Sequence, residues 1–118
     1  MGLTDLFVAR SSRSFRTGDD PRLARRVVDD IRLRDAAPGG LPPGVVGGRS
    51  GPGHFNAASP FAAFDADLRV APDGRGGSLV TEHKVAFSPI PGVAWVANAI
   101  HDLATHPDDA YERSRRRR

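Results

Sequence analysis

The stretch that decides the fold is residues 64–87, FDADLRVAPDGRGGSLVTEHKVAF. Its first part, residues 64–70, alternates apolar and polar side chains, which is typical of a strand with one buried face. Residues 79–87 alternate as well, and the turn-forming segment 72–77 separates the two parts. The pattern predicts a β-hairpin. In its second strand we expect Leu79, Thr81, His83, Val85 and Phe87 on the apolar side, and Val80, Glu82, Lys84 and Ala86 on the solvent side.

Two registers of this hairpin keep the apolar faces together. One places Asp67 opposite Lys84, so that opposite charges pair on the solvent face. The other is slid by two residues and places Asp67 opposite Glu82, which is repulsive. We therefore expect the first register, with Phe64 opposite Phe87.

A helix is predicted after the hairpin. Pro89 and Pro91 stop the second strand, because proline cannot donate to a ladder of hydrogen bonds. Apolar residues then recur at spacings of three and four, which predicts a helix that begins at Val93. Pro107 ends this helix near Thr105 or restarts it. The expected core face of the helix is Val93, Val96, Ala97, Ile100 and Ala104.

The first third of the chain predicts one strand and one helix. Residues 5–17 contain a β-compatible stretch and are assigned to the strand. Asp20 followed by Pro21 is a typical helix start, because an aspartate can cap free N–H groups and proline suits the first helical position. Leu23, Val27 and Ile31 then follow at a spacing of four, which predicts an amphipathic helix of about three turns.

Residues 35–60 are predicted to be a disordered linker. Residues 38–53 hold seven glycines and four prolines, and ordering such a segment costs backbone entropy with little apolar burial in return. The chain is therefore expected to be one α+β domain, in which an antiparallel sheet packs on a C-terminal helix. Its parts are residues 1–34, the linker 35–60, the hairpin and helix 61–112, and an arginine-rich tail, 113–118.

Composition excludes several classes of protein. The 118 residues contain no cysteine, which rules out disulfides, thiolate zinc sites and a cysteine nucleophile. No apolar run approaches the roughly 18 residues that span a membrane, and the N-terminus lacks a signal-peptide pattern. We therefore expect a cytoplasmic protein without membrane contact.

The net charge of +3 is unevenly distributed. Five arginines at positions 113 and 115–118 leave 12 basic against 14 acidic residues in the rest of the chain. A basic nucleic-acid-binding face on the folded body is not indicated, and nucleic acid is not the expected partner.

The histidines and carboxylates give weak signals for chemistry. His101 and His106 are five residues apart, whereas a helical zinc pair needs a spacing of four, so no metal and no cofactor is expected. Asp65 and Asp67 belong to the solvent face of their strand. His83 is expected on the apolar side of the sheet, as the one titratable group placed to act as an acid or base near neutral pH.

The second half of the chain resembles a known superfamily. It contains, in order, an acid-bearing strand that ends at Val70, a glycine-rich turn, the strand 78–87, Pro89-Ile90-Pro91-Gly92 and a helix with Trp95. This order resembles the C-terminal part of the polyketide cyclase/dehydrase branch of the START-like (SRPBCC, helix-grip) superfamily. Residues 7–15 and the helix that follows Pro21 look like that family's first strand and helix. The resemblance implies a curved antiparallel sheet around a C-terminal helix, with an apolar cavity between them and several strands in its middle. The tract 35–60 shows no pattern for those strands, so we expect a partial helix-grip fold, in which either a partner copy completes the sheet or the fold is only marginally stable.

The resemblance implies a protein that binds a small hydrophobic molecule, with cyclase or dehydrase chemistry if the pocket is complete. An alternative is a non-enzymatic interaction protein whose arginine-rich tail binds nucleic acid or an acidic partner. A truncated or degenerate chain without activity is the third. The expected pocket residues are Phe64, Leu68, His83, Val85, Trp95 and Ile100, and His83 is the candidate for catalysis.

Overall fold

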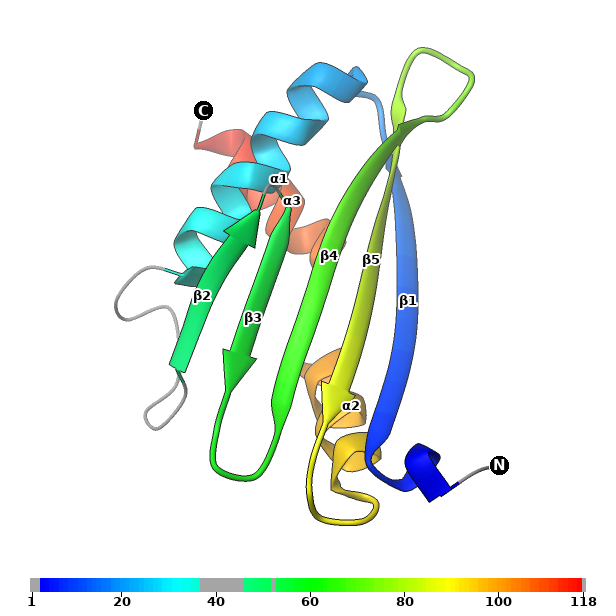
Figure 1. The fold of residues 1–118 in the computed structure, drawn as a ribbon. Coiled ribbons are helices and arrows are strands. Elements are labelled where there is room, and N and C mark those ends of the chain that lie inside the picture. Colours follow the sequence, from blue (N-terminus) through cyan, green and yellow to red (C-terminus); the bar gives the residue numbers. More distant parts are fainter. Residues whose placement is uncertain (1–2, 37–45, 52, 118) are drawn as a thin grey trace.

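The computed structural model describes residues 3–36, 46–51 and 53–117. In chain order, the elements are η1 (Leu3–Leu6), β1 (Val8–Thr17), α1 (Pro21–Ala36), β2 (Val46–Gly51), β3 (His54–Ala58), β4 (Ala63–Pro72), β5 (Ser78–Phe87), α2 (Val93–Ala104) and α3 (Pro107–Arg116). Five strands form one antiparallel sheet, and the helices lie against one of its faces (Figure 1). The predicted α+β class, with a sheet packed on C-terminal helices, is confirmed. We call the face under the helices the covered face and the opposite one the open face.

The strand order is β1-β5-β4-β3-β2, so the first strand lies beside the last. The predicted hairpin is present as β4 and β5, but its register is neither of the two expected. Asp67 lies opposite His83, and Leu68 lies opposite Glu82. This register differs by one residue from each expected one, and a one-residue shift turns every side chain of a strand to the other face.

The faces of β5 are therefore the reverse of the prediction. Ser78, Val80, Glu82, Lys84 and Ala86 are buried on the covered face, while His83 and Phe87 are exposed on the open face. The two charges can be buried because partners reach them. Arg13 of β1 and Arg32 of α1 lie beside Glu82, and Asp102 of α2 pairs with Lys84.

Part of the predicted linker 35–60 belongs to the sheet. Strands β2 and β3 occupy residues 46–51 and 54–58, and β3 pairs with β4. The linker prediction is wrong for these residues, and residues 37–45 and 52 lie outside the described part of the chain. The two added strands stand between the first helix and the hairpin, where the resemblance implies middle strands.

Gly53 shows why a glycine-rich segment can join this sheet. Its φ angle is 73°, and its carbonyl accepts hydrogen bonds from the Leu68 N–H at 2.9 Å and from Arg32 Nε at 3.0 Å. A Cβ atom at this position would collide with the Leu68 carbonyl. Glycine is therefore the residue that fits this bend.

Helix α1 begins where the sequence predicts and supplies most of the apolar core. The Asp20 carboxylate accepts a hydrogen bond from the Leu23 N–H at 2.9 Å, which caps the helix. The helix extends over 16 residues, longer than the three turns expected. The main apolar cluster beneath it consists of Ala24, Val27, Val28, Ile31, Leu68, Val80 and Tyr111.

Helix α2 begins at Val93 as predicted but presents the opposite face to the sheet. Its buried residues are Ala94 and Asn98, whereas Val96, Ile100 and Leu103 are 59%, 60% and 80% exposed. The predicted core face of Val93, Val96, Ala97, Ile100 and Ala104 is wrong. The strand beneath α2 carries Glu82 and Lys84 on its covered face, so the polar side of the helix packs there.

The C-terminal arginines that the structure describes do not form a separate tail. Arg113 and Arg115 lie in the last turns of α3, where Ser114 between them is buried. In the described residues, no helix is long and apolar enough to cross a membrane.

Candidate functional site

The residues predicted to line one pocket are distributed over three places. Phe64 and Leu68 of β4 point to the covered face, while His83 and Val85 of β5 lie on the open face. Trp95 and Ile100 are exposed on α2, and the Trp95 indole N–H donates to the carbonyl of Asp5. These six side chains therefore do not surround one cavity between sheet and helix.

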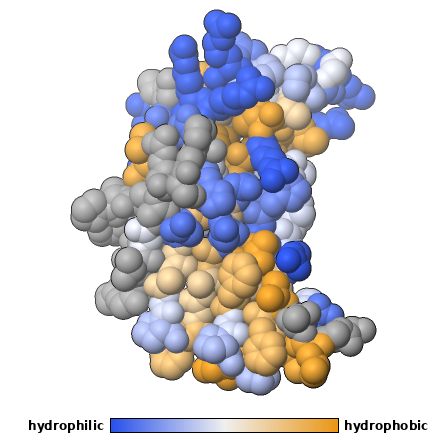
Figure 2. All heavy atoms as spheres, viewed as in Figure 1, coloured by the Kyte–Doolittle hydropathy of each residue, from blue (hydrophilic) through white to orange (hydrophobic). Residues whose placement is uncertain are grey.

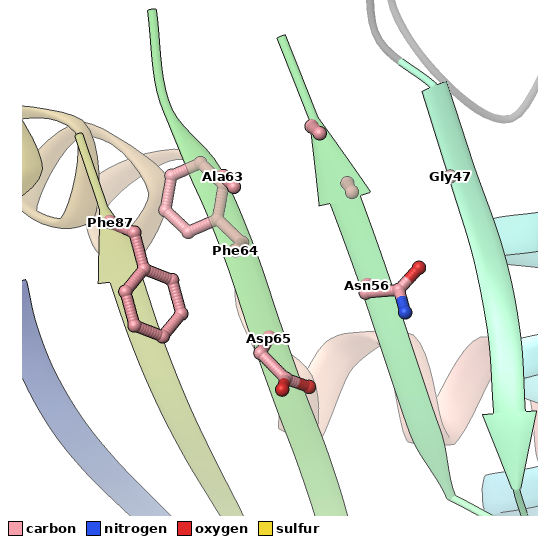
Figure 3. Close-up of a pocket in the computed structure, with 8 residues that line it drawn as sticks. Gly47, Asn56, Ala63, Phe64, Asp65 and Phe87 are labelled. Carbon is pink, nitrogen blue, oxygen red and sulfur yellow. The ribbon is translucent and has the colours of Figure 1, made fainter. Parts of the chain in front are cut away.

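An apolar depression lies instead on the open face, at the end of the sheet where β3, β4 and β5 run side by side. Its volume is about 460 Å³, within the range of roughly 300–1,000 Å³ found for small-molecule sites. Figure 3 shows Asn56, Asp65 and Phe87 extending from three neighbouring strands around it. The lining residues are Gly47, Asn56, Ala57, Ala58, Ala63, Phe64, Asp65 and Phe87.

A second hollow adjoins the first. It has a volume of about 290 Å³ and is bordered by the loops at the same end of the sheet, including Phe7, Pro60 and Pro89. Both hollows share Ala63 and Phe87 as lining residues, so the Phe87 ring stands between them. On the face seen in Figure 1, hydrophobic residues gather over this lower end and hydrophilic residues lie above it (Figure 2).

The depression has a polar border on one side. Asp65 and Asn56 are opposite each other in the β3–β4 pairing. The His54 ring lies between two carboxylates, with Nε2 against Asp65 and Nδ1 2.5 Å from Asp67. His83 is the β5 neighbour of Asp67. A ligand in the depression would thus meet apolar walls and, at one edge, carboxylate and amide oxygens that accept hydrogen bonds.

A second polar group, which we call the ionic cluster, lies on the covered face under α2. It consists of Arg13, Glu82, Lys84, His101 and Asp102. Lys84 Nζ donates to Asp102 Oδ1 at 2.5 Å and lies 2.5 Å from His101 Nδ1. Arg13 Nη2 donates to Glu82 Oε1 at 2.7 Å, and its Nη1 donates to the Asp102 carbonyl at 3.1 Å.

Burial shifts the pKa values of two members of the ionic cluster, Lys84 and His101. Burial lowers the pKa of Lys84, and the hydrogen bond to Asp102 partly offsets this effect. Burial and the neighbouring Lys84 charge also lower the pKa of His101, which favours a neutral ring whose Nδ1 accepts from the ammonium group. Lys84 is only 1% exposed, so a substrate has no access to its amine. The cluster joins α2 to the sheet and is not arranged as a catalytic site.

Metal binding has no support in the part of the chain that is described. No group of three or more His, Asp or Glu side chains there could hold a metal ion. His101 and Asp102 are engaged by Lys84, and His106 is exposed just before α3.

Sequence reasoning named one residue of the depression, Phe64, and missed the rest. Phe87 was expected on the covered side, and Asn56 and Ala57 fell inside the predicted linker. The alternation in the sequence His54-Phe55-Asn56-Ala57-Ala58 is a weak strand signal that the surrounding glycines and prolines outweighed.

The comparisons with known proteins give no assignment. No family model matches the chain, and no curated protein matches it. The geometry of the depression is therefore the basis for a functional proposal.

Proposed function

We propose that the protein binds a small, mostly apolar molecule in the depression on the open face of its sheet. The observation that carries this proposal is the pair of adjoining apolar hollows on either side of Phe87. An aromatic ring at the centre of such a surface offers a large apolar contact area. The START-like resemblance of residues 64–92 implies the same class of ligand.

The ligand is expected to carry a hydrogen-bond donor at one end. Asp65 and Asn56 supply acceptor oxygens at a single edge of the depression, while Ala58, Ala63 and Phe87 present apolar side chains on the open face beside them. We propose binding without catalysis, because His83 is not among the lining residues and Lys84 is buried on the covered face.

The test is titration with N-phenyl-1-naphthylamine, a neutral dye whose fluorescence rises in apolar surroundings. The expected result is saturable binding to one site, weakened about tenfold or more by Phe87→Ser, since an aromatic contact contributes roughly 1.5–3 kcal/mol. The matched control is Phe61→Ser, because Phe61 is 64% exposed nearby and lines neither hollow. Equal loss of binding in the two variants would show non-specific adsorption to the apolar end and refute the proposal.

A further inference from the structure

We infer that α1 and α3 together form a surface that binds the phosphate backbone of double-stranded nucleic acid without reading its sequence. We call this the basic surface and define it by six arginines. Arg22, Arg25 and Arg26 lie in the first turns of α1, and Arg113, Arg116 and Arg117 lie at the end of α3. It is separate from the proposed ligand site and does not depend on it.

A buried carboxylate fixes the two helices together. Asp19 lies two residues before the start of α1 and accepts hydrogen bonds from the Tyr111 hydroxyl at 2.7 Å and from Arg115 Nε at 2.9 Å. Tyr111 and Arg115 are one turn apart in α3. The end of α3 is thereby held against the beginning of α1, and the two helices lie side by side (Figure 1).

The six arginines keep their charge available for a partner. All six are exposed, and none forms an ion pair with another residue of the described ranges. Asp19 is already neutralised by Arg115. The exposed acids next to or within the two helices, among residues whose burial is described, are Asp20, which caps α1, and Asp108, Asp109 and Glu112 of α3. Six exposed guanidinium groups thus outnumber four exposed carboxylates, two of which lie at the far, N-terminal end of α3.

The sum of charges along the sequence does not predict the basic surface. The sequence expectation against nucleic acid rested on a net negative charge in everything but the last residues. The fold instead brings two basic segments together from opposite ends of the sequence, and it leaves the acidic middle of the chain in the sheet.

Phosphate in a duplex is the anion that fits the basic surface best. The planar guanidinium fork binds phosphate through two parallel hydrogen bonds, and two packed helices roughly 8–10 Å apart present two rows of such forks. Single strands bind through stacking on exposed aromatic rings. The aromatic residues here, Phe15 and Tyr111, pack on each other at 5.5 Å, and Tyr111 is 1% exposed.

An anionic membrane fits less well. Interfacial membrane binding combines basic residues with apolar side chains that insert beside them. Of the large exposed apolar side chains, Leu33 lies on α1, near its far end, and none lies on α3. The others belong to η1, α2 and the strand ends and loops of the opposite end of the sheet.

The test measures binding of the full chain to a fluorescently labelled 20-base-pair DNA duplex of arbitrary sequence, by anisotropy, from 50 to 200 mM NaCl. Non-specific binding of this kind has dissociation constants of roughly 10⁻⁴–10⁻⁶ M and weakens with salt in proportion to the phosphates contacted. Two double variants separate the helices: Arg22→Gln/Arg26→Gln for α1 and Arg113→Gln/Arg116→Gln for α3. Each is expected to weaken binding about tenfold at low salt and to reduce the slope of log K against log salt by about 2.

The charge-matched control is Arg10→Gln/Arg69→Gln, because both arginines are exposed on the strands and lie outside the basic surface. It is expected to leave the salt slope unchanged. Circular dichroism should show all variants folded, since the substituted side chains are exposed.

Three results would overturn the inference. If the α3 variant alone weakened binding, the C-terminal arginines would act as an independent tail. If the control weakened binding as much as the two test variants, the loss of affinity would result from the lower net charge of the protein and not from the basic surface. If a single-stranded 20-mer, polyglutamate or anionic vesicles bound more tightly than the duplex, the partner chemistry would be wrong.

Discussion

The covered face of the sheet is packed in two different ways at its two ends. Under α1 and α3, Val80 of β5 lies in an apolar cluster with Leu68 and Tyr111. Under α2, Lys84 of the same strand lies in the ionic cluster, and the apolar cluster there contains only Ala9, Ala86 and Ala94, with Phe64 beside them. One strand thus buries an apolar residue at one end and a charge at the other. Helix α2 is therefore held to the sheet by specific ion pairs more than by buried apolar area.

The largest effect is expected at the apolar end. Tyr111→Ala should lower the free energy of unfolding by about 3–5 kcal/mol, because it empties the space of a fully buried aromatic side chain. Urea unfolding followed by circular dichroism measures it. Tyr111→Phe is the control: it keeps the ring, loses the hydrogen bond to Asp19 and should cost about 1–3 kcal/mol. A loss below 1 kcal/mol for Tyr111→Ala would mean that the apolar end does not dominate stability.

At the ionic end, neutralising one member of a buried ion pair should lower the free energy of unfolding by slightly less. Glu82→Gln should destabilise the fold by about 3 kcal/mol, because it removes the charge of the buried carboxylate that lies beside both Arg13 and Arg32. We expect the lower end of the range since the Arg13 side chain is 25% exposed.

A second variant distinguishes broken pairing from lost packing at that end. Lys84→Met combined with Asp102→Leu removes both charges of one pair, and it should be less destabilising than the sum of the two single changes. Additive losses would show that the two residues do not interact energetically.

The two ends should also respond differently to pH. The pKa of His101 is lowered by folding from 6.5, so below that pH the unfolded chain binds a proton that the folded protein does not. The free energy of unfolding should therefore fall as pH decreases from 6.5 towards the folded-state pKa. His101→Gln should remove this dependence in urea titrations at pH 5 to 7, whereas Tyr111→Phe should keep it. An unchanged dependence in His101→Gln would assign the effect to another group.

The smallest effect is expected on the outer side of α2. Leu103→Ser should change the free energy of unfolding by no more than about 0.5 kcal/mol, because the side chain is 80% exposed. In contrast, Ala94→Leu, on the buried side of the same helix, should cost about 1–3 kcal/mol through overpacking. Thermal melts of the two variants compare the two sides of the helix directly, and a large loss for Leu103→Ser would contradict the exposure of the outer side of α2.

The sequence predicts the elements of this fold better than it predicts their faces. Strand β1, the start of α1 at Asp20 and Pro21, the hairpin and the start of α2 all follow from local signals. The faces of β5 and α2 are both reversed, and the two errors have one cause. Periodicity assumes that charges face water, but Glu82 and Lys84 meet Arg13 and Asp102 inside. That pairing depends on residues more than 60 positions apart in the case of Arg13 and Glu82, which no local window contains.

The open-face depression was predictable only in part. Phe64 and Phe87 are both in the hairpin, but the register that places Phe87 beside Ala63 differs by one residue from the registers that charge pairing on the solvent side favours. Strands β2 and β3 complete the depression. Glycines within β2 hide it, because glycine carries no side chain whose alternation could be detected, and β3 is short and follows the glycine- and proline-rich segment.

The pairing of the first strand with the last also affects how the protein forms during its synthesis. Val8 pairs with Phe87 and Thr17 with Ser78, so β1 has no neighbouring strand until β5 has left the ribosome. The β4–β5 hairpin, which is local, can form as soon as its own residues emerge, and contacts between distant parts of a chain form slowly. The N-terminal segment therefore waits unpaired while some 70 further residues are translated, a delay of roughly 4–14 s at 5–20 residues per second. The pairing of β1 with β5 can therefore form only after the last strand has been synthesised.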